Sequence, residues 1–213
     1  MIRTMRIALL AFAMTVVILG MVAFYARDLH SGTEITLKTE PVDPRSLFLG
    51  HYATLGYEIS RLGGEHLDNR CYDRNEAIYV TLERDSADWR PVATAPAMPR
   101  DGFAENRVTL RGRVSWHSGC SNEERDDAVA NETPVTERAR LSEEQLFAQY
   151  GIEEYFASPE AARRLEDLAR RRPAEGEEAL EPLQIILSVP QSGRALIKGV
   201  VIDGEKVYDQ TIW

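Results

Sequence analysis

The feature that most constrains this chain is one apolar run near its N-terminus, from Ile7 to Phe24, which contains no charged residue. A helix needs about 20 apolar residues to cross the hydrocarbon core of a bilayer, which is about 30 Å thick. The stretch from Ile7 to Tyr25 nearly reaches that length, and Thr15 and Gly20 are its only weakly polar positions. The run therefore predicts a helix that crosses a membrane, with residues 7–25 in contact with lipid.

A cleaved signal peptide is the main alternative to a permanent anchor, because its apolar core is about 7–15 residues long and ends at small residues. The run here is longer, and its cut sites are poor. Cleavage after Ala26 would place Phe24 at the third position before the cut, and cleavage after Ala23 would place Met21 there. A buried core helix is a weaker alternative, since such a helix keeps a polar face. We expect an uncleaved anchor.

The charges beside the run predict its orientation. Arg3 and Arg6 precede it, whereas Arg27 and Asp28 form a neutral pair after it. Because positive charge is retained on the cytoplasmic side, the N-terminus is expected in the cytoplasm. The sequence thus divides into a cytoplasmic and membrane-spanning part, 1–27, and a domain, 28–213, outside the bacterial inner membrane in the periplasm.

Composition limits what the domain binds. Beyond the apolar run, from Arg27 onward, 23 Lys and Arg stand against 34 Asp and Glu, a formal charge of −11. Nucleic-acid binding requires a basic face, so this class is excluded, as is lying flat on anionic lipid. No cofactor is predicted. The expected partners are inner-membrane lipid, through residues 7–25, and another membrane protein.

Two cysteines, Cys71 and Cys120, are present. In an oxidising compartment such a pair is a candidate disulfide. A disulfide that closes the loop from Cys71 to Cys120 would stabilise the fold by about 3–4 kcal/mol in the chain-entropy model. Two independent buried thiols are the alternative, because geometry decides whether a bond forms. Neither cysteine belongs to a CxxC pair, which argues against a zinc site.

Alternating apolar and polar residues predict about seven strands joined mostly by short turns. The last three form a meander, with a hairpin turn at Asp203-Gly204, and Gly112 is a candidate bulge. The predicted fold class is α+β: a transmembrane helix followed by a mainly antiparallel β domain, as a sheet or small barrel, with two or three helices. The predicted strands cover residues 33–39, 51–60, 77–83, 106–116, 183–189, 195–202 and 206–213, and residues 89–93 are a candidate hairpin partner of the strand at 77–83.

Helices are expected within an insert at residues 142–171. A short helix is predicted from Ser142 to Gly151, and a second from Ser158 to about Arg171, where Ser-Pro-Glu supplies a cap, a proline at the first position and an acid in the first turn. Residues 118–137, rich in Asn, Asp, Glu and Thr, are predicted to form a mobile acidic loop.

The densest cluster of unusual residues runs from Pro41 to Tyr57. Asp43 lies between two prolines, Arg45 and Phe48 follow, and a glycine precedes a strand that carries two tyrosines. This pattern resembles the GDYXXLXY protein family of bacterial membrane-anchored proteins. Gly50, Tyr52, Leu55 and Tyr57 match residue for residue, and His51 stands where the family has Asp.

Two further segments carry the same resemblance. They are Tyr150-Gly-Ile-Glu-Glu-Tyr-Phe156 and the closing pattern from Ile197 to Gly204. The resemblance implies an anchored extracytoplasmic domain, often encoded beside a multi-pass membrane protein, and no established activity. We interpret the central motif as a fold-defining turn rather than a chemical site, because ordered turns with aromatic residues more often belong to cores.

No catalytic signature of high specificity is present. Ser46 with Lys198 is a conceivable Ser-Lys dyad of a membrane-bound hydrolase or peptidase, although the position three residues before Pro44, where signal peptidases have their serine, is Pro41. A pocket lined by Tyr52, Tyr57 and Trp116 would instead indicate a ligand-binding barrel. Metal binding is not predicted, because His51, His66, Asp68, His117 and Cys120 lack a recognised ligand spacing.

The leading hypothesis is therefore an anchored accessory protein with no enzymatic activity that binds another envelope protein. Its candidate contact residues are Arg45, Phe48, His51, Tyr52 and Tyr57.

Overall fold

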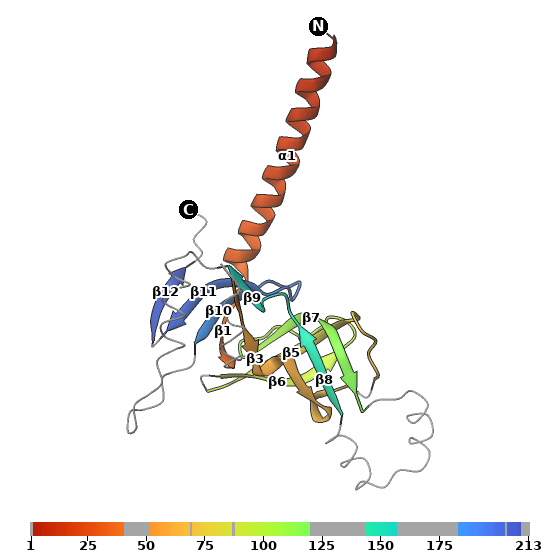
Figure 1. Cartoon of the computed structure of the whole chain (residues 1–213), viewed down its shortest axis with the longest axis vertical. Helices are drawn as coiled ribbons and strands as arrows, with labels where there is room; N and C mark the ends of the chain where they lie inside the picture. The colour runs from red at the N-terminus through yellow and green to blue at the C-terminus, as the bar shows by residue number, and fades with distance from the viewer. Residues whose placement is uncertain are drawn as a thin grey trace.

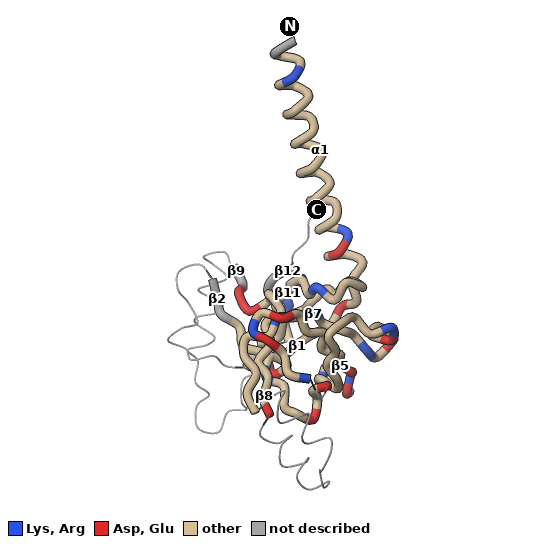
Figure 2. The backbone as a smooth tube through the Cα atoms, turned by 90° about the vertical axis from the view of Figure 1, so that its right-hand side faces the viewer, with Lys and Arg blue, Asp and Glu red and all other residues tan. Residues whose placement is uncertain are grey.

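The computed structural model describes residues 2–40, 52–68, 70–86, 88–119, 144–156, 183–202 and 204–209. Within these ranges the one α-helix, α1 (Ile2–Ser31), projects from a domain of β-strands (Figure 1). The part of α1 from Thr4 to Ser31 is long and apolar enough to cross a membrane, and none of its most apolar stretch is buried. Figure 2 shows charged residues only near its two ends.

The first sheet has the strand order β12-β11-β10-β1-β3, and every neighbouring pair is antiparallel. The predicted meander of the last three strands is confirmed. Ile202 pairs with Glu205 across a two-residue connection that ends in Gly204, whose φ of 76° lies in the region that favours glycine. The strands are β1 (Thr33–Glu40), β3 (Gly56–Tyr57), β10 (Gln184–Val189), β11 (Leu196–Ile202) and β12 (Glu205–Asp209).

The second sheet has the order β4-β8-β7-β5-β6 and is also antiparallel. The strands predicted at 77–83 and 106–116, and the hairpin partner at 89–93, are confirmed as β5, β7 and β6. The strands are β4 (Arg61–Gly63), β5 (Ala77–Asp85), β6 (Asp88–Ala95), β7 (Arg107–Ser118) and β8 (Gln145–Gln149).

The strand predicted at 51–60 is broken into pieces. Its described part forms β2 (Tyr52–Thr54), β3 and a single 3-10 turn (Glu58–Ser60). A second 3-10 turn follows β4 at Gly64–His66. β2 pairs only with β9 (Glu154–Phe156), in a separate two-stranded ladder. The break lets the chain pass from one ladder to the next, so each piece pairs with a different partner.

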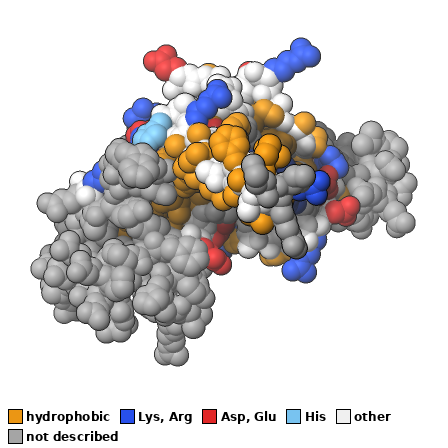
Figure 3. All heavy atoms as spheres, turned by 90° about the horizontal axis from the view of Figure 1, so that it is seen from above, with side chains coloured by type: hydrophobic (Ala, Val, Ile, Leu, Met, Phe, Trp, Pro, Cys, Tyr) orange, Lys and Arg blue, Asp and Glu red, His pale blue; other side chains and the backbone are white. Residues whose placement is uncertain are grey.

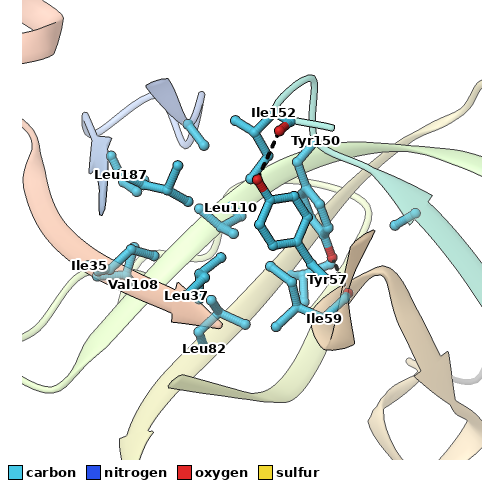
Figure 4. Packing of buried hydrophobic residues seen from close by; sticks show 14 of the residues in the cluster. Ile35, Leu37, Tyr57, Ile59, Leu82, Val108, Leu110, Tyr150, Ile152 and Leu187 are labelled. Atoms are coloured by element: carbon cyan, nitrogen blue, oxygen red, sulfur yellow. Dashed lines mark hydrogen bonds between the residues drawn. The ribbon is translucent and has the colours of Figure 1, made fainter. Parts of the chain in front are cut away.

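The antiparallel sheets, one of them nearly barrel-shaped, share one apolar core. Alternate residues of β1, Ile35 and Leu37, point inward beside Leu187 of β10, and Leu110 of β7 faces them from the second sheet (Figure 4). Such alternation is the period of a strand with one buried face. The α+β class is thus confirmed, with apolar residues of both sheets supplying the core.

The helix predicted from Ser142 to Gly151 is wrong, because residues 145–149 form β8. Leu146 and Ala148 are buried whereas Gln145 and Gln149 are exposed, which is the two-residue period of a strand. Glu, Gln, Leu and Ala favour helices by intrinsic propensity, but hydrogen bonding between β4 and β7 overrides it here. The proposed insert at 142–171 is therefore not helical over 145–149, and it also contains β9.

Gly112 is not a bulge, contrary to expectation. The pairing of β7 with β5 runs without a shift through Ile78 and Gly112, and the shift in β7 lies between Val114 and Trp116 instead. A Cβ at Gly112 would lie 3.0 Å from the Gln149 carbonyl oxygen and 3.1 Å from the Tyr150 ring. A side chain at this position would require the neighbouring strand or the Tyr150 ring to shift by a few tenths of an ångström, so glycine suits the close packing here.

The number of helices also differs from the expected two or three. Over the described ranges α1 is the one α-helix, beside the two 3-10 turns. The helix predicted from Ser158 to Arg171, and all of the predicted loop at 118–137 except its first two residues, lie outside the described residues.

Candidate functional site

The structure describes part of the motif from Pro41 to Tyr57. Leu55 and Tyr57 are both buried, and Tyr57 is only 2% exposed. Tyr52 is described by its backbone alone, in β2. The motif and contact candidates that lie outside the described residues are Asp43, Arg45, Ser46, Phe48, Gly50 and His51.

Tyr57 takes part in a reciprocal pair of hydrogen bonds with the segment that begins at Tyr150. The Tyr57 hydroxyl donates to the carbonyl of Ile152 at 2.9 Å, and the Tyr150 hydroxyl donates to the carbonyl of Ile59 at 2.7 Å. Figure 4 shows the two rings side by side, each reaching the backbone of the other's segment. We call this arrangement, formed by Tyr57, Ile59, Tyr150 and Ile152, the tyrosine clasp.

The backbone on both sides of the clasp is also joined. The Leu55 N–H donates to the carbonyl of Glu153 at 2.7 Å, and β2 pairs with β9 through Ala53 and Tyr155. The carboxylate of Glu153 accepts the N–H groups of Tyr150, at 2.5 Å, and Gly151, at 2.8 Å. The GDYXXLXY-like segment therefore lies along the Tyr150–Phe156 segment, which carries the second part of the resemblance.

Burial also changes the acid–base properties of the clasp. It raises the pKa of Tyr57 and of Tyr150 well above the ordinary tyrosine range, and the Glu153 carboxylate adds to both shifts. Neutral hydroxyls are needed to donate to the two carbonyls. A catalytic tyrosine would require a pKa nearer the operating pH, so the clasp has the properties of a structural contact.

Alkaline pH should consequently destabilise the fold. Above pH 10 both tyrosines ionise in the unfolded chain but keep their protons in the folded one, so stability falls as pH rises. The expected loss at pH 11 is about 1.4 kcal/mol for each tyrosine. Urea unfolding of the full-length protein in detergent at pH 9 and pH 11 measures it. The Tyr57→Phe/Tyr150→Phe double variant should lose less stability over the same interval, and an equal loss would contradict this assignment.

A second buried polar cluster surrounds His117 on β7. The N–H of Tyr72 donates to Nδ1 of His117 at 3.1 Å, and Nε2 of His117 lies 3.0 Å from Oε1 of Glu144. The His117 and Glu144 side chains are 3% and 1% exposed. Because Nδ1 accepts a hydrogen bond, the neutral ring carries its proton on Nε2 and donates to the carboxylate.

This geometry leaves His117 without a free nitrogen. Both ring nitrogens are engaged within the chain, so the imidazole links β7, the segment around Tyr72 and the residue before β8 rather than facing a substrate. No residue spacing in the sequence relates Glu144 to His117. That pairing depends on the antiparallel alignment of β7 with β8, in which His117 lies opposite Leu146.

Replacing His117 by phenylalanine should cost about 2 kcal/mol of unfolding free energy, because a buried N–H and a buried carboxylate each lose their imidazole partner. His66→Phe is the matched control. The His66 side chain is 30% exposed and its ionic partner is the neighbouring Glu65 at 3.5 Å, so its replacement should cost less than about 0.5 kcal/mol. Urea unfolding measures both, and equal costs would show that the cluster contributes nothing.

Lys198, the candidate partner of Ser46, is engaged elsewhere. In β11 it is the extra residue of a bulge, since Ile197 pairs with Leu187 and Gly199 pairs with Ile186. Its ammonium group forms an ion pair with the carboxylate of Glu34 on β1. Ser46 lies outside the described residues, so the Ser46–Lys198 dyad stays a prediction.

The remaining candidates do not come together where they are described. Tyr57 lies in the core, whereas Trp116 is 47% exposed, so these two do not line one barrel mouth. The backbone N–H of Asp68 donates to the hydroxyl of Thr94 at 3.0 Å. Among the described residues, no group of three or more His, Cys, Asp and Glu side chains is arranged to hold a metal ion.

The structure describes one of the two cysteines of the predicted disulfide. Cys71 is disulfide-bonded, one residue before the Tyr72 N–H that meets His117. Cys120, the other cysteine of the sequence, lies outside the described residues. The Cys71–Cys120 pairing therefore stays a prediction.

Comparison with protein-family models identifies the family of this chain. A family model described as GDYXXLXY protein matches residues 14–200, from within α1 to within β11. No curated protein matches this chain, and no solved structure does. The match covers most of the chain, including the tyrosine clasp and β10. The chain belongs to the GDYXXLXY protein family.

Proposed function

We propose that the chain is a single-pass protein of the bacterial inner membrane whose β domain stands in the periplasm and serves as an accessory partner of another envelope membrane protein. α1 supports the anchor by its length, its apolar composition and the exposure of its side chains. The disulfide at Cys71 supports an oxidising compartment for the domain.

The observation that carries the proposal is the internal use of the family's own motif. Leu55 and Tyr57 lie in the core, and the Tyr57 hydroxyl is engaged by the backbone of Ile152. Side chains that are buried and hydrogen-bonded in this way hold a fold together. What the domain offers to its surroundings is therefore its surface, which favours binding over chemistry.

The test uses the multi-pass membrane protein that the family resemblance leads us to expect beside this gene. Outside α1, the exposed large apolar side chains of the described residues are Val92 on β6 and Trp116 on β7. A photo-crosslinking amino acid at each position, in full-length protein in native membranes, should yield an adduct that contains the tagged multi-pass protein. A strain lacking that protein is the control. Monomer alone at both positions, and no co-purification in mild detergent, would contradict the proposal.

A further inference from the structure

The anchor helix enters the β domain without a flexible linker. α1 ends at Ser31 and β1 begins at Thr33, so Gly32 alone lies between them. Leu29, in the last turn of the helix, is 0% exposed. The last turn of α1 is therefore part of the domain, although the remainder of the helix stands free of it.

The junction is closely packed against β10. The hydroxyl of Ser188 donates to the carbonyl of Asp28 at 3.0 Å, which satisfies one of the helix-end carbonyls that lack a partner within the helix. A Cβ at Gly32 would lie 2.2 Å from the Ser188 hydroxyl oxygen and 2.8 Å from the backbone nitrogen of Val189. Contacts this close fix both the position and the direction of α1 relative to the sheet.

The distance from the lipid core to the domain is short. Tyr25 ends the apolar run, and Leu29 is already buried in the domain. The rise along the helix axis from Tyr25 to Leu29 is about one helical turn, or about 6 Å. The headgroup region on each side of a bilayer is about 5–8 Å thick, because the whole bilayer is about 40–45 Å thick and its hydrocarbon core is about 30 Å thick. The domain surface beside α1 consequently begins where the headgroups lie.

The turn between β10 and β11 belongs to this surface. Val189 pairs with Thr33, so the chain leaves β10 beside the base of α1. The turn is held down on β7, because the carbonyl of Gly193 accepts the N–H of Arg111 at 2.8 Å. Figure 1 shows the turn on the α1 side of the domain, and Figure 3, seen from that side, looks down on the projecting α1, with charged side chains of the chain around the apolar ones.

We propose that this surface, formed by Arg27, His30, Gln191, Ser192 and Arg194, is seated in the phospholipid headgroup layer of the bilayer that α1 crosses. All five residues are exposed. Their polar and basic side chains suit phosphate and glycerol oxygens, and arginine binds phosphate through paired hydrogen bonds. The inference rests on the proposed membrane crossing by α1. It adds that the rigid junction, rather than lipid affinity of the acidic domain, holds the surface in place.

Headgroup quenching tests the placement. An environment-sensitive fluorescent amino acid replaces Ser192 or Ser118 in the full-length protein, which is reconstituted in phosphatidylcholine vesicles that carry a nitroxide on the headgroup. Ser118 is the matched distant site: it is exposed, lies about 23 Å along β7 beyond Arg111 at about 3.3 Å per residue, and β7 runs away from α1 (Figure 1). Quenching at position 192 should be several-fold stronger than at 118. Equal quenching would overturn the proposal.

A second arm tests the junction. A flexible Gly-Ser segment inserted between Arg27 and Asp28 should reduce quenching at 192 to the level seen at 118. Quenching that persists at 192 would show that the domain binds lipid by itself and would overturn the role of the junction. The same fluorophore at Phe12, with a nitroxide on the acyl chain, reports the membrane crossing separately. Absence of quenching at position 12 would count against the proposed anchor rather than against the placement of the surface.

Discussion

Replacing Tyr57 by alanine should cost about 3–5 kcal/mol of unfolding free energy, the range for truncating a large buried aromatic side chain. The residue is 2% exposed and belongs to the core shared by both sheets. Its loss would open a cavity and would also leave the Ile152 carbonyl without the hydroxyl it accepts. A domain of this size is stabilised by only about 5–15 kcal/mol, so much of that margin would be lost.

Urea unfolding of the full-length protein in detergent, followed by tryptophan fluorescence, measures this cost. Tyr79→Ala is the control, because Tyr79 on β5 is only partly buried and lies outside the core cluster. Tyr57→Phe and Tyr150→Phe should each cost about 1–3 kcal/mol, and their double-mutant cycle should show coupling because both hold the same two segments. A Tyr57→Ala variant as stable as the Tyr79→Ala control would refute a structural role for the motif.

Replacing Gly32 by valine should destabilise the junction by about 3 kcal/mol, at the upper end of what overpacking a closed site costs. The Cβ alone would meet the Val189 backbone nitrogen at 2.8 Å and its carbonyl carbon at 2.9 Å. Those atoms belong to the β1–β10 ladder and cannot move aside cheaply. We expect α1 to detach from β10 while the rest of the domain keeps its pairing.

Limited proteolysis at Arg27 in detergent follows that detachment, together with urea unfolding. Gly20→Val is the matched control, because a Cβ at Gly20 meets nothing within 4 Å. Cleavage should accelerate in Gly32→Val and stay unchanged in Gly20→Val. If the two variants were cleaved equally slowly, the junction would have to be loose, and the seating of the domain on the bilayer would lose its basis.

The strands could be predicted from sequence wherever burial alternates. In β1 the inward Ile35 and Leu37 are separated by a polar residue, and in the meander the Asp-Gly pair marks the turn before β12. β8 could not be predicted, because its residues favour a helix and only its two neighbouring strands make it extended. A strand recruited by partners distant in the sequence leaves no reliable local signal.

The candidate site was predictable only in part. The sequence predicts a fold-defining turn in the motif from Pro41 to Tyr57, and of its described residues Leu55 and Tyr57 lie in the core. It does not indicate that Tyr57 bonds to a residue 95 positions away, or that Tyr150 bonds to one 91 positions away. The His117–Glu144 contact likewise depends on strand register, which local patterns leave undetermined.

The sidedness of the intact chain tests whether α1 is an uncleaved anchor with the β domain in the periplasm. Spheroplasts expressing the protein with a tag at each end are treated with protease, and their membranes are extracted with alkaline carbonate. The proposed topology predicts that the full-length chain stays in the membrane pellet, and that protease outside the cell removes the C-terminal tag but spares the N-terminal one. A chain recovered whole from the cytosol, or a mature form that lacks α1, would contradict it.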